Sequence, residues 1–210
     1  MSNMNDDSRS ALAPANASPR ALRRVGIIGA TAPGIGIAMD LLDAGVPVTL
    51  FELERAALDA VLAPARGDGR RMALLAGTVN FHHLKDCDLV IDTVRTDGAG
   101  REGLFRRLDQ TARPGAVLMT LGTPEGIDRI ARCTRRSGEV LGLQLAGTAA
   151  QGPVWELVPG SATTGATLAT VIALAGELRK DAVVAGTCQG GAARQREQAG
   201  GAWQIGQGQE

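Results

Sequence analysis

The sequence predicts the α/β fold class, with a doubly wound, mostly parallel sheet covered by helices on both faces in three αβα layers. Two observations predict it. Short apolar runs alternate with segments of helical periodicity along residues 23–187. The runs are apolar at consecutive positions, which is typical of parallel strands buried on both faces. The chain has 210 residues, of which 44% are apolar, and it is long enough to form one hydrophobic core.

Each predicted strand is a short apolar run bounded by residues that favour turns or solvent. The first run ends at Gly29 and the second ends at Glu52. The predicted strands are, in order, Val25–Ile28, Val48–Phe51, Ala76–Val79, Asp88–Asp92, Ala116–Thr120, Val140–Leu145, Val154–Val158 and Ala182–Val184.

Each predicted helix repeats apolar residues every three or four positions. Gly45 follows the first helix as a C-cap, Pro64 stops the second, and Pro124 begins the fourth. The predicted helices are, in order, Gly34–Leu42, Glu54–Leu62, Gly100–Thr111, Pro124–Cys133 and Thr163–Arg179.

The two ends of the chain differ in composition from the middle. Residues 1–22 are rich in Ser, Asn, Asp, Ala and Pro and predict a disordered N-terminal arm. Residues 188–210 are rich in Gly, Gln and Ala and predict a flexible tail. The N-terminal segment lacks the apolar stretch of a secretory signal, and no apolar run is long enough to span a bilayer. We therefore expect a cytoplasmic protein with no membrane partner.

Charge, cysteine and histidine content exclude several classes of function. The formal net charge is zero, so no electrostatic footprint for nucleic acid is expected. The three cysteines are far apart and odd in number, which predicts a reducing compartment rather than a disulfide framework. The only histidines, His82 and His83, are adjacent and have no ligand cluster near them, so no metal site is predicted. Arg101, Arg106 and Arg107 share one helix and predict a solvated face.

A glycine-containing turn joins the first strand to the first helix. Dinucleotide-binding Rossmann domains carry G-x-G-x-x-G at this point, where the helix N-terminus and the turn amides bind a diphosphate. Gly29 and Gly34 supply the first and third glycines, and Thr31 stands in place of the second. The Thr31 side chain is expected to hold the phosphates off unless its hydroxyl compensates. The predicted cofactor-binding residues of this turn are Gly29, Ala30, Thr31, Gly34 and Ile35.

Glu52 ends the second predicted strand, where an acidic residue binds the ribose hydroxyls of NAD. Its charge would repel the 2′-phosphate of NADP, so NAD is the predicted cofactor. A Rossmann-type fold that no longer binds a nucleotide stays open as the alternative, because one glycine of the motif is missing.

Several motifs, in order from about residue 24 to residue 187, resemble the NAD-binding domain of 3-hydroxyacyl-CoA dehydrogenases. Gly34–Ala38 is similar to the family's G-x-G-I-A, and Cys87–Val94 is similar to its D-L-V-I-E-A-V strand. Val154–Gly160 resembles L-V-E-V-V-P-G. Further similar segments are Gly103–Asp109, Pro114–Leu118 and Val140–Leu143. The resemblance implies NAD as cofactor and allows an acyl-CoA ligand and a homodimer.

The resemblance also locates the family's chemistry, in which a His takes the proton of a 3-hydroxyacyl-CoA while hydride passes to NAD. That His position holds Gln144, and the position of the Glu that orients the His holds Glu156. Thr123 matches the family's substrate-side Ser, and Leu121 replaces an Asn. Because a Gln side chain cannot take up a proton near neutral pH, the resemblance implies a degenerate active site.

Three functions stay open at this point. The favoured one is an NAD-binding protein with weak or no catalysis, because Gln144 replaces the His and the family's C-terminal helical domain has no recognisable counterpart. The second is an active NAD-dependent oxidoreductase on a 3-hydroxyacyl-CoA or related hydroxy acid, using Glu156 or a partner subunit. The third is a scaffold with the same fold and no nucleotide. A short-chain dehydrogenase is excluded, because that class needs a catalytic Tyr and the chain has no Tyr.

Overall fold

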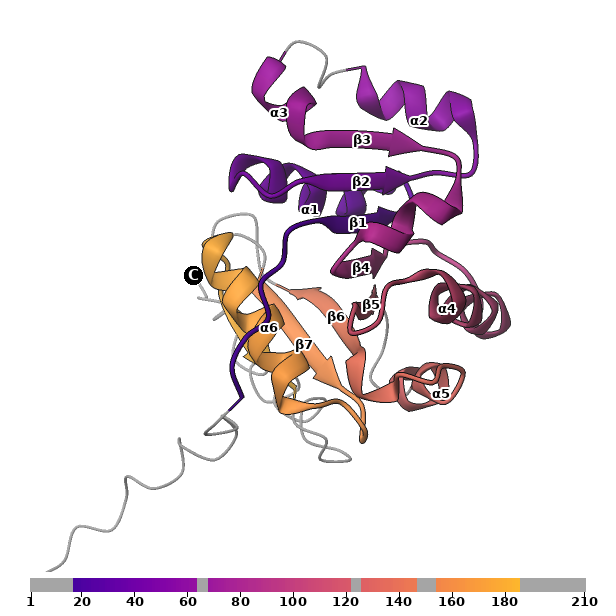
Figure 1. Ribbon diagram of the computed structural model, residues 1–210, viewed down its shortest axis with the longest axis vertical. Coiled ribbons are helices and arrows are strands. Elements are labelled where there is room, and N and C mark those ends of the chain that lie inside the picture. The colour runs from indigo at the N-terminus through magenta and orange to yellow at the C-terminus, as the bar shows by residue number, and fades with distance from the viewer. Residues whose placement is uncertain (1–16, 64–67, 122–125, 147–153, 186–210) are drawn as a thin grey trace, which may run out of the picture.

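The computed structural model describes residues 17–63, 68–121, 126–146 and 154–185. These residues form one eight-stranded sheet in the order β3-β2-β1-β4-β5-β6-β7-β8 (Figure 1). The strands are β1 Val25–Ile28, β2 Val48–Phe51, β3 Leu75–Thr78, β4 Leu89–Asp92, β5 Val117–Leu121, β6 Val140–Ala146, β7 Val154–Pro159 and β8 Ala182–Val184. All neighbouring strands are parallel except β6 and β7. The predicted fold class is therefore confirmed.

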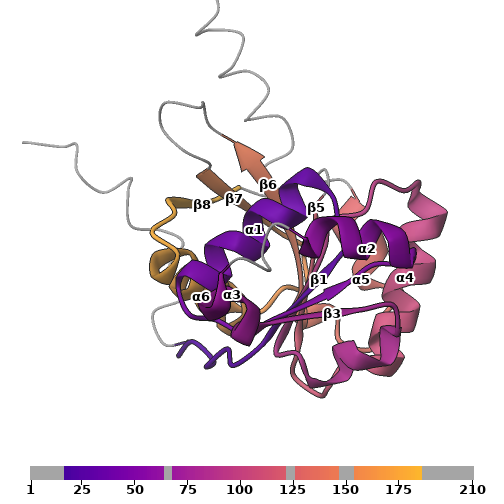
Figure 2. The ribbon, with the colours of Figure 1, turned by 90° about the horizontal axis from the view of Figure 1, so that it is seen from above.

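Helices cover both faces of the sheet. Figures 1 and 2 show α1 and α6 on one side of the sheet and α4 and α5 on the other. The helices are α1 Ala32–Asp43, α2 Arg55–Leu62, α3 Gly69–Leu74, α4 Gly98–Thr111, α5 Ile127–Ala131 and α6 Gly165–Glu177, with short 3₁₀ helices η2 Phe81–Asp86 and η4 Ser137–Glu139.

The hydrophobic core has two parts because successive residues of a strand point to opposite faces. Ile27 of β1 packs into the cluster beneath α1 and α6, together with Leu41 and Leu174. Ile28, the next residue, packs into the cluster beneath α4 and α5 with Phe105. Both sides of β1 are buried, as its uninterrupted apolar run predicts.

Three segments differ from the sequence prediction. Residues 69–74, which belong to none of the predicted strands or helices, form α3, and the Asp68 side chain caps this helix by accepting the amides of Arg70 and Arg71. Residues 81–86, which also belong to none of the predicted elements, form η2, which buries Phe81 and Leu84 against the α4 side of the sheet. Of the predicted helix over Pro124–Cys133, residues 124–125 lie outside the described residues, and α5 spans Ile127–Ala131, so it ends before Cys133.

The segment before β1 lies against the domain. The structure describes it from residue 17, and residues 1–16 and 186–210, which hold most of the predicted arm and tail, lie outside the described residues. The Arg20 amide donates to Thr170 Oγ1 at 3.0 Å, and its guanidinium donates to the Gly115 carbonyl at 2.6 Å. The amides of Arg23 and Arg24 both donate to the Asp88 carboxylate. Residues 20–24 are therefore tied to α6 and to the amino ends of the neighbouring strands.

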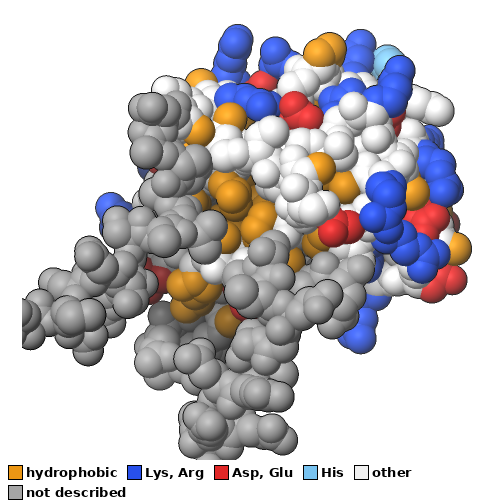
Figure 3. Space-filling model, turned by 90° about the horizontal axis from the view of Figure 1, so that it is seen from below, with side chains coloured by type: hydrophobic (Ala, Val, Ile, Leu, Met, Phe, Trp, Pro, Cys, Tyr) orange, Lys and Arg blue, Asp and Glu red, His pale blue; other side chains and the backbone are white. Residues whose placement is uncertain are grey.

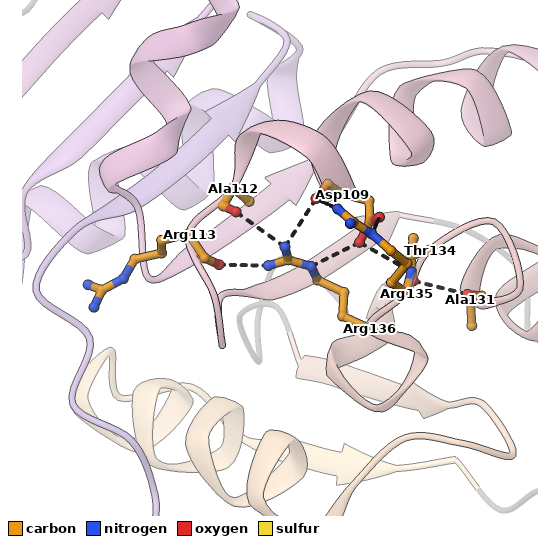
Figure 4. Close-up of polar contacts among 7 residues, drawn as sticks. All are labelled: Asp109, Ala112, Arg113, Ala131, Thr134, Arg135 and Arg136. Atoms are coloured by element: carbon orange, nitrogen blue, oxygen red, sulfur yellow. Dashed lines mark hydrogen bonds and ion pairs between the residues drawn. The ribbon is translucent and has the colours of Figure 1, made fainter.

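A cluster of charged side chains joins the end of α4 to the segment before β6 (Figure 4). The Asp109 carboxylate accepts Nε of Arg135 at 2.8 Å and Nε of Arg136 at 3.1 Å. The Arg136 guanidinium also donates to the carbonyls of Asp109, Ala112 and Arg113, at 3.1, 3.2 and 2.6 Å. Helix-end carbonyls lack partners within the helix, and a cation there is favoured by the helix dipole. Arg136 therefore acts as the C-terminal cap of α4.

Charges of both signs share the surface. Acidic side chains lie among the Arg and Lys side chains on the face shown in Figure 3. On α4, Arg106 pairs with Glu102 at 3.0 Å and is 56% exposed. Arg107 stacks on the Phe81 ring at 4.1 Å from its centroid. Arg101, by contrast, is only 18% exposed and pairs with a buried carboxylate. The solvated face predicted for these three arginines is therefore wrong for Arg101.

None of the described helices combines the length and the apolar character that crossing a membrane requires.

Candidate functional site

The predicted site residues meet at one edge of the sheet. Because β1 to β6 are parallel, their carboxyl ends lie at the same edge, and Gly29, Glu52 and Thr93 directly follow β1, β2 and β4. Strand β1 lies between β2 and β4, and the chain continues from β1 into α1 on one face of the sheet and from β4 into α4 on the other (Figures 1 and 2). In open α/β sheets, ligands bind at this topological switch point.

The turn between β1 and α1 has no room for a side chain at either Gly29 or Gly34. Gly29 has φ of 96°, which favours glycine, and a Cβ there would lie 2.8 Å from Val94 Cγ2. A Cβ on Gly34 would lie 2.5 Å from Thr93 Oγ1 and 2.7 Å from the Gly29 carbonyl oxygen. The first and third glycines therefore do what the fingerprint requires of them: they allow the tight turn and the close approach of α1 to the sheet.

Replacing Gly34 with Ala is expected to lower the free energy of unfolding by about 2–3 kcal/mol, because its Cβ would overlap a backbone oxygen. Gly36, in the same helix, is the matched control, since a Cβ there meets nothing within 4 Å. Gly36→Ala is expected to raise the free energy by up to about 1 kcal/mol through helix propensity. Urea unfolding measures both. Equal effects of the two substitutions would contradict this account of the turn.

The Thr31 hydroxyl points into the turn. Thr31 is the N-cap of α1, and its Oγ1 accepts the Gly34 amide at 3.2 Å. The same hydroxyl donates to Thr93 Oγ1 at 2.8 Å. The Ile35 amide donates to the Thr31 carbonyl at 2.8 Å within the first turn of the helix. Among the described residues, the amides of Thr31 and Ala32 have no hydrogen-bond acceptor, so these two donors are available to an anion.

Glu52 is held beside this turn by both of its carboxylate oxygens. Oε2 accepts the Ala30 amide at 2.7 Å, and Oε1 accepts the Leu53 amide at 2.7 Å. The side chain is half-buried. A carboxylate accepts about four hydrogen bonds, so the oriented group keeps capacity for two further donors. Leu53 and Val79, at the ends of β2 and β3, are 70% and 36% exposed and give this corner an apolar surface.

Gln144 and Glu156 are directly opposite each other in the antiparallel pair of β6 and β7. Opposite residues point to the same face of a sheet, so both half-buried side chains lie on the α4 and α5 side, near the carboxyl end of β6 and the amino end of β7. Leu121 ends β5 and pairs with Leu143. Thr123, the third residue implied by the family chemistry, lies outside the described residues.

Asp92, the last residue of β4, is a buried carboxylate at this edge of the sheet. Its side chain is 0% exposed, accepts the Thr120 hydroxyl at 2.9 Å and the Val94 amide at 3.0 Å, and pairs with Arg101 Nε at 3.3 Å. Burial raises the pKa of Asp92 above its ordinary value, against the lowering effect of these partners. Arg101 also donates to the Val94 carbonyl at 3.0 Å, so the pair fixes the loop that packs on Gly29.

Other potential sites lie elsewhere or have too few groups. Across the described ranges, no three His, Cys, Asp or Glu side chains gather in a way that could hold a metal ion. A crevice of about 340 Å³ lies at the opposite edge of the sheet, lined by residues that include Arg20, Asp88 and Arg113. Cys87 is buried, and burial raises the pKa of its thiol to about 11, so the thiolate that would react is scarce at neutral pH.

Comparison with known proteins gives the same picture over most of the chain. Residues 24–188 match the family model described as the NAD binding domain of 3-hydroxyacyl-CoA dehydrogenase. A 3-hydroxybutyryl-CoA dehydrogenase of Mycobacterium tuberculosis is 34% identical over 155 residues, which cover 66% of this chain and 54% of that protein. A peroxisomal bifunctional enzyme of Danio rerio is 29% identical over 185 residues, covering 83% of this chain and 26% of that protein.

Among solved structures, M. tuberculosis FadB2 superposes with a TM-score of 0.71 at 30% identity and covers 87% of this chain and 74% of that one. The chain thus spans about half of one curated relative and about a quarter of the other. The family model covers well over half of the sequence and includes the turn, Glu52, Gln144 and Glu156. The chain therefore belongs to the 3-hydroxyacyl-CoA dehydrogenase family and comprises its NAD-binding domain.

Proposed function

We propose that this protein binds NAD at the β1–α1 turn and catalyses hydride transfer weakly or not at all. The observation that carries the second half is Gln144, which faces Glu156 across β6 and β7 at the position where the family has its proton acceptor. NAD, when bound, supplies the hydride acceptor. Gln144 can donate a hydrogen bond to a substrate oxygen but cannot take its proton near neutral pH.

The geometry of the turn supports the first half. Gly29 and Gly34 leave no side chain between the turn and α1, and the amides of Thr31 and Ala32, which have no acceptor among the described residues, are available as donors to a diphosphate. Glu52 is already oriented by the Ala30 amide and keeps capacity for the two hydroxyls of a ribose. Leu53 and Val79 offer apolar surface beyond Glu52 for a base. The residues present therefore fit the cofactor.

Wild-type protein is expected to prefer NAD over NADP, and Glu52→Gln is expected to remove most of that preference. A carboxylate repels a 2′-phosphate, whereas a neutral amide does not. Thermal shift with each nucleotide tests this, since a ligand at about 100 times its Kd adds about 2.7 kcal/mol of stability.

The matched control for this experiment is Glu54→Gln. Glu54 is exposed, and its side chain makes no capping hydrogen bond to α2. The preference should survive this substitution. If Glu52→Gln and wild type discriminate equally between NAD and NADP, Glu52 does not contribute to recognition of the ribose.

The two alternative functions give different results in the same assays. An active oxidoreductase would oxidise 3-hydroxybutyryl-CoA with NAD at ordinary enzyme rates, which our proposal excludes. A scaffold without nucleotide would show no change of melting temperature with NAD. The expected acyl-CoA ligand, the homodimer and the cytoplasmic location stay predictions.

A further inference from the structure

Two departures from the family pattern touch each other. Thr31 stands where the dinucleotide fingerprint has its second glycine, and Thr93 stands where the family's D-L-V-I-E-A-V strand has alanine. They are 62 residues apart in sequence, yet their hydroxyl oxygens are 2.8 Å apart. Relative to the family pattern, each of these two residues adds a hydroxyl group, and the two hydroxyls are hydrogen-bonded to each other.

The two hydroxyls complete one directed chain of hydrogen bonds. The Gly34 amide donates to Thr31, Thr31 donates to Thr93, and Thr93 donates to the Ile28 carbonyl at 2.9 Å. Thr93 also lies 3.2 Å from the Gly29 carbonyl. In each of these hydrogen bonds a donor has an acceptor. The series of hydrogen bonds connects the first turn of α1 to the end of β4 and then to the end of β1. Thr93 is 2% exposed, so water does not replace it.

Without Thr93, the Thr31 hydroxyl loses its acceptor. A hydroxyl hydrogen without a partner in a half-buried turn favours a rotamer that reaches water, and the diphosphate is expected on the solvent side of the same turn, next to the exposed Ala32. A glycine in place of Thr31 would have no hydroxyl to orient. An alanine at position 93 is therefore compatible with the family's glycine in the turn and conflicts with Thr31.

We propose that Thr31 and Thr93 are a coupled pair of positioning residues: Thr93 holds the Thr31 side chain inside the turn and so keeps the turn open to the diphosphate of NAD. This rests on the proposed NAD binding. The pair replaces the Gly and Ala of the family pattern as a unit.

Four proteins test the pair: wild type, Thr31→Gly, Thr93→Ala and the double variant. Titration calorimetry gives the NAD Kd of each. Thr93→Ala should weaken binding about tenfold, the size expected when one buried hydroxyl loses its acceptor. Thr31→Gly should change Kd less, and the double variant should recover most of the affinity that Thr93→Ala loses. Such recovery is the mark of coupling between neighbouring residues.

Thr93→Ser, which keeps the hydroxyl, should bind NAD as wild type does, and this separates the hydrogen bond from side-chain volume. Amide hydrogen exchange of Gly34, measured without nucleotide, should be slow in wild type and Thr93→Ser and faster in Thr93→Ala. The proposal is wrong if the effects of the two substitutions on Kd multiply in the double variant. It is also wrong if Thr31→Gly tightens NAD binding equally in the wild-type and the Thr93→Ala backgrounds, because Thr31 would then only block the diphosphate. If wild type itself does not bind NAD, the proposed function fails first, and the Gly34 exchange still reports whether the pair is coupled.

Discussion

Gln144→His is expected to raise the rate of 3-hydroxybutyryl-CoA oxidation by about 10²–10⁴-fold, the usual contribution of a general base. A histidine at position 144 would have a carboxylate beside it. Residue 144 is directly opposite Glu156, and opposite residues in an antiparallel pair have Cβ atoms roughly 4.5–5.5 Å apart. A histidine there would have a carboxylate within reach to orient its ring and stabilise its protonated form. Absorbance of the NADH formed measures the rate.

The controls for this experiment follow from the same pair. Gln144→Asn keeps an amide and should give no gain, while Glu156→Gln in the Gln144→His background should lose most of the gain. The pH profile of the gain should rise through the pKa of a histidine, near 6.5 in an unperturbed side chain. An unchanged rate in Gln144→His, with NAD binding intact, would show that the missing proton acceptor is not what limits catalysis.

Asp109→Ala is expected to lower the free energy of unfolding by about 3 kcal/mol, because it leaves Arg136, only 15% exposed, without its carboxylate. The Arg135 pair contributes less, since that side chain is 80% exposed. The Asp109 carboxylate also positions Arg136, the C-terminal cap of α4, by accepting its Nε (Figure 4). Urea unfolding at neutral pH measures the loss.

Asp43→Ala is the matched control for Asp109→Ala. It removes an ion pair with Arg71 at 2.7 Å, but Asp43 is 56% exposed. We expect a loss of about 1 kcal/mol or less. If the two substitutions cost the same, the Asp109 cluster does not stabilise the domain beyond an ordinary surface pair.

The stability that Asp109 contributes should depend on pH. Burial alone would raise the pKa of Asp109, but hydrogen bonds from Arg135 and Arg136 outweigh it and hold the pKa below its ordinary value. A lowered folded-state pKa gives stability that is present above the unfolded pKa, near 3.9, and is lost as pH falls further. The difference between wild type and Asp109→Ala should therefore shrink below about pH 4. A constant difference down to pH 2 would contradict the assignment.

Local sequence patterns predict the sheet and the turn well. The buried strands appear as continuous apolar runs because both of their faces are covered. Gly29, Gly34 and Glu52 are recognisable because the dinucleotide fingerprint has glycines and an acidic residue at fixed points along one strand–turn–helix unit and the strand that follows it. The relation of Gln144 to Glu156 follows from the family resemblance and is consistent with the β6–β7 register.

What the sequence does not predict depends on contacts between distant segments. The direction of the Thr31 hydroxyl is set by Thr93, which no pattern around the turn reveals. The sequence predicts that Arg101 is a solvated residue of α4, because nothing near it in sequence indicates its ion pair with Asp92 at the end of β4. Helix α3 is short and buries none of its residues, so its apolar spacing is too weak to stand out, and the Asp68 cap marks it instead.

The β6–β7 register also bears on how this protein could change. Glutamine and histidine codons differ at the third base alone, so a single point mutation at position 144 would put an imidazole beside Glu156. In a population under selection for the oxidation reaction, regained acid–base chemistry would thus lie one nucleotide away, and a screen of random single-base variants should recover it at this codon first.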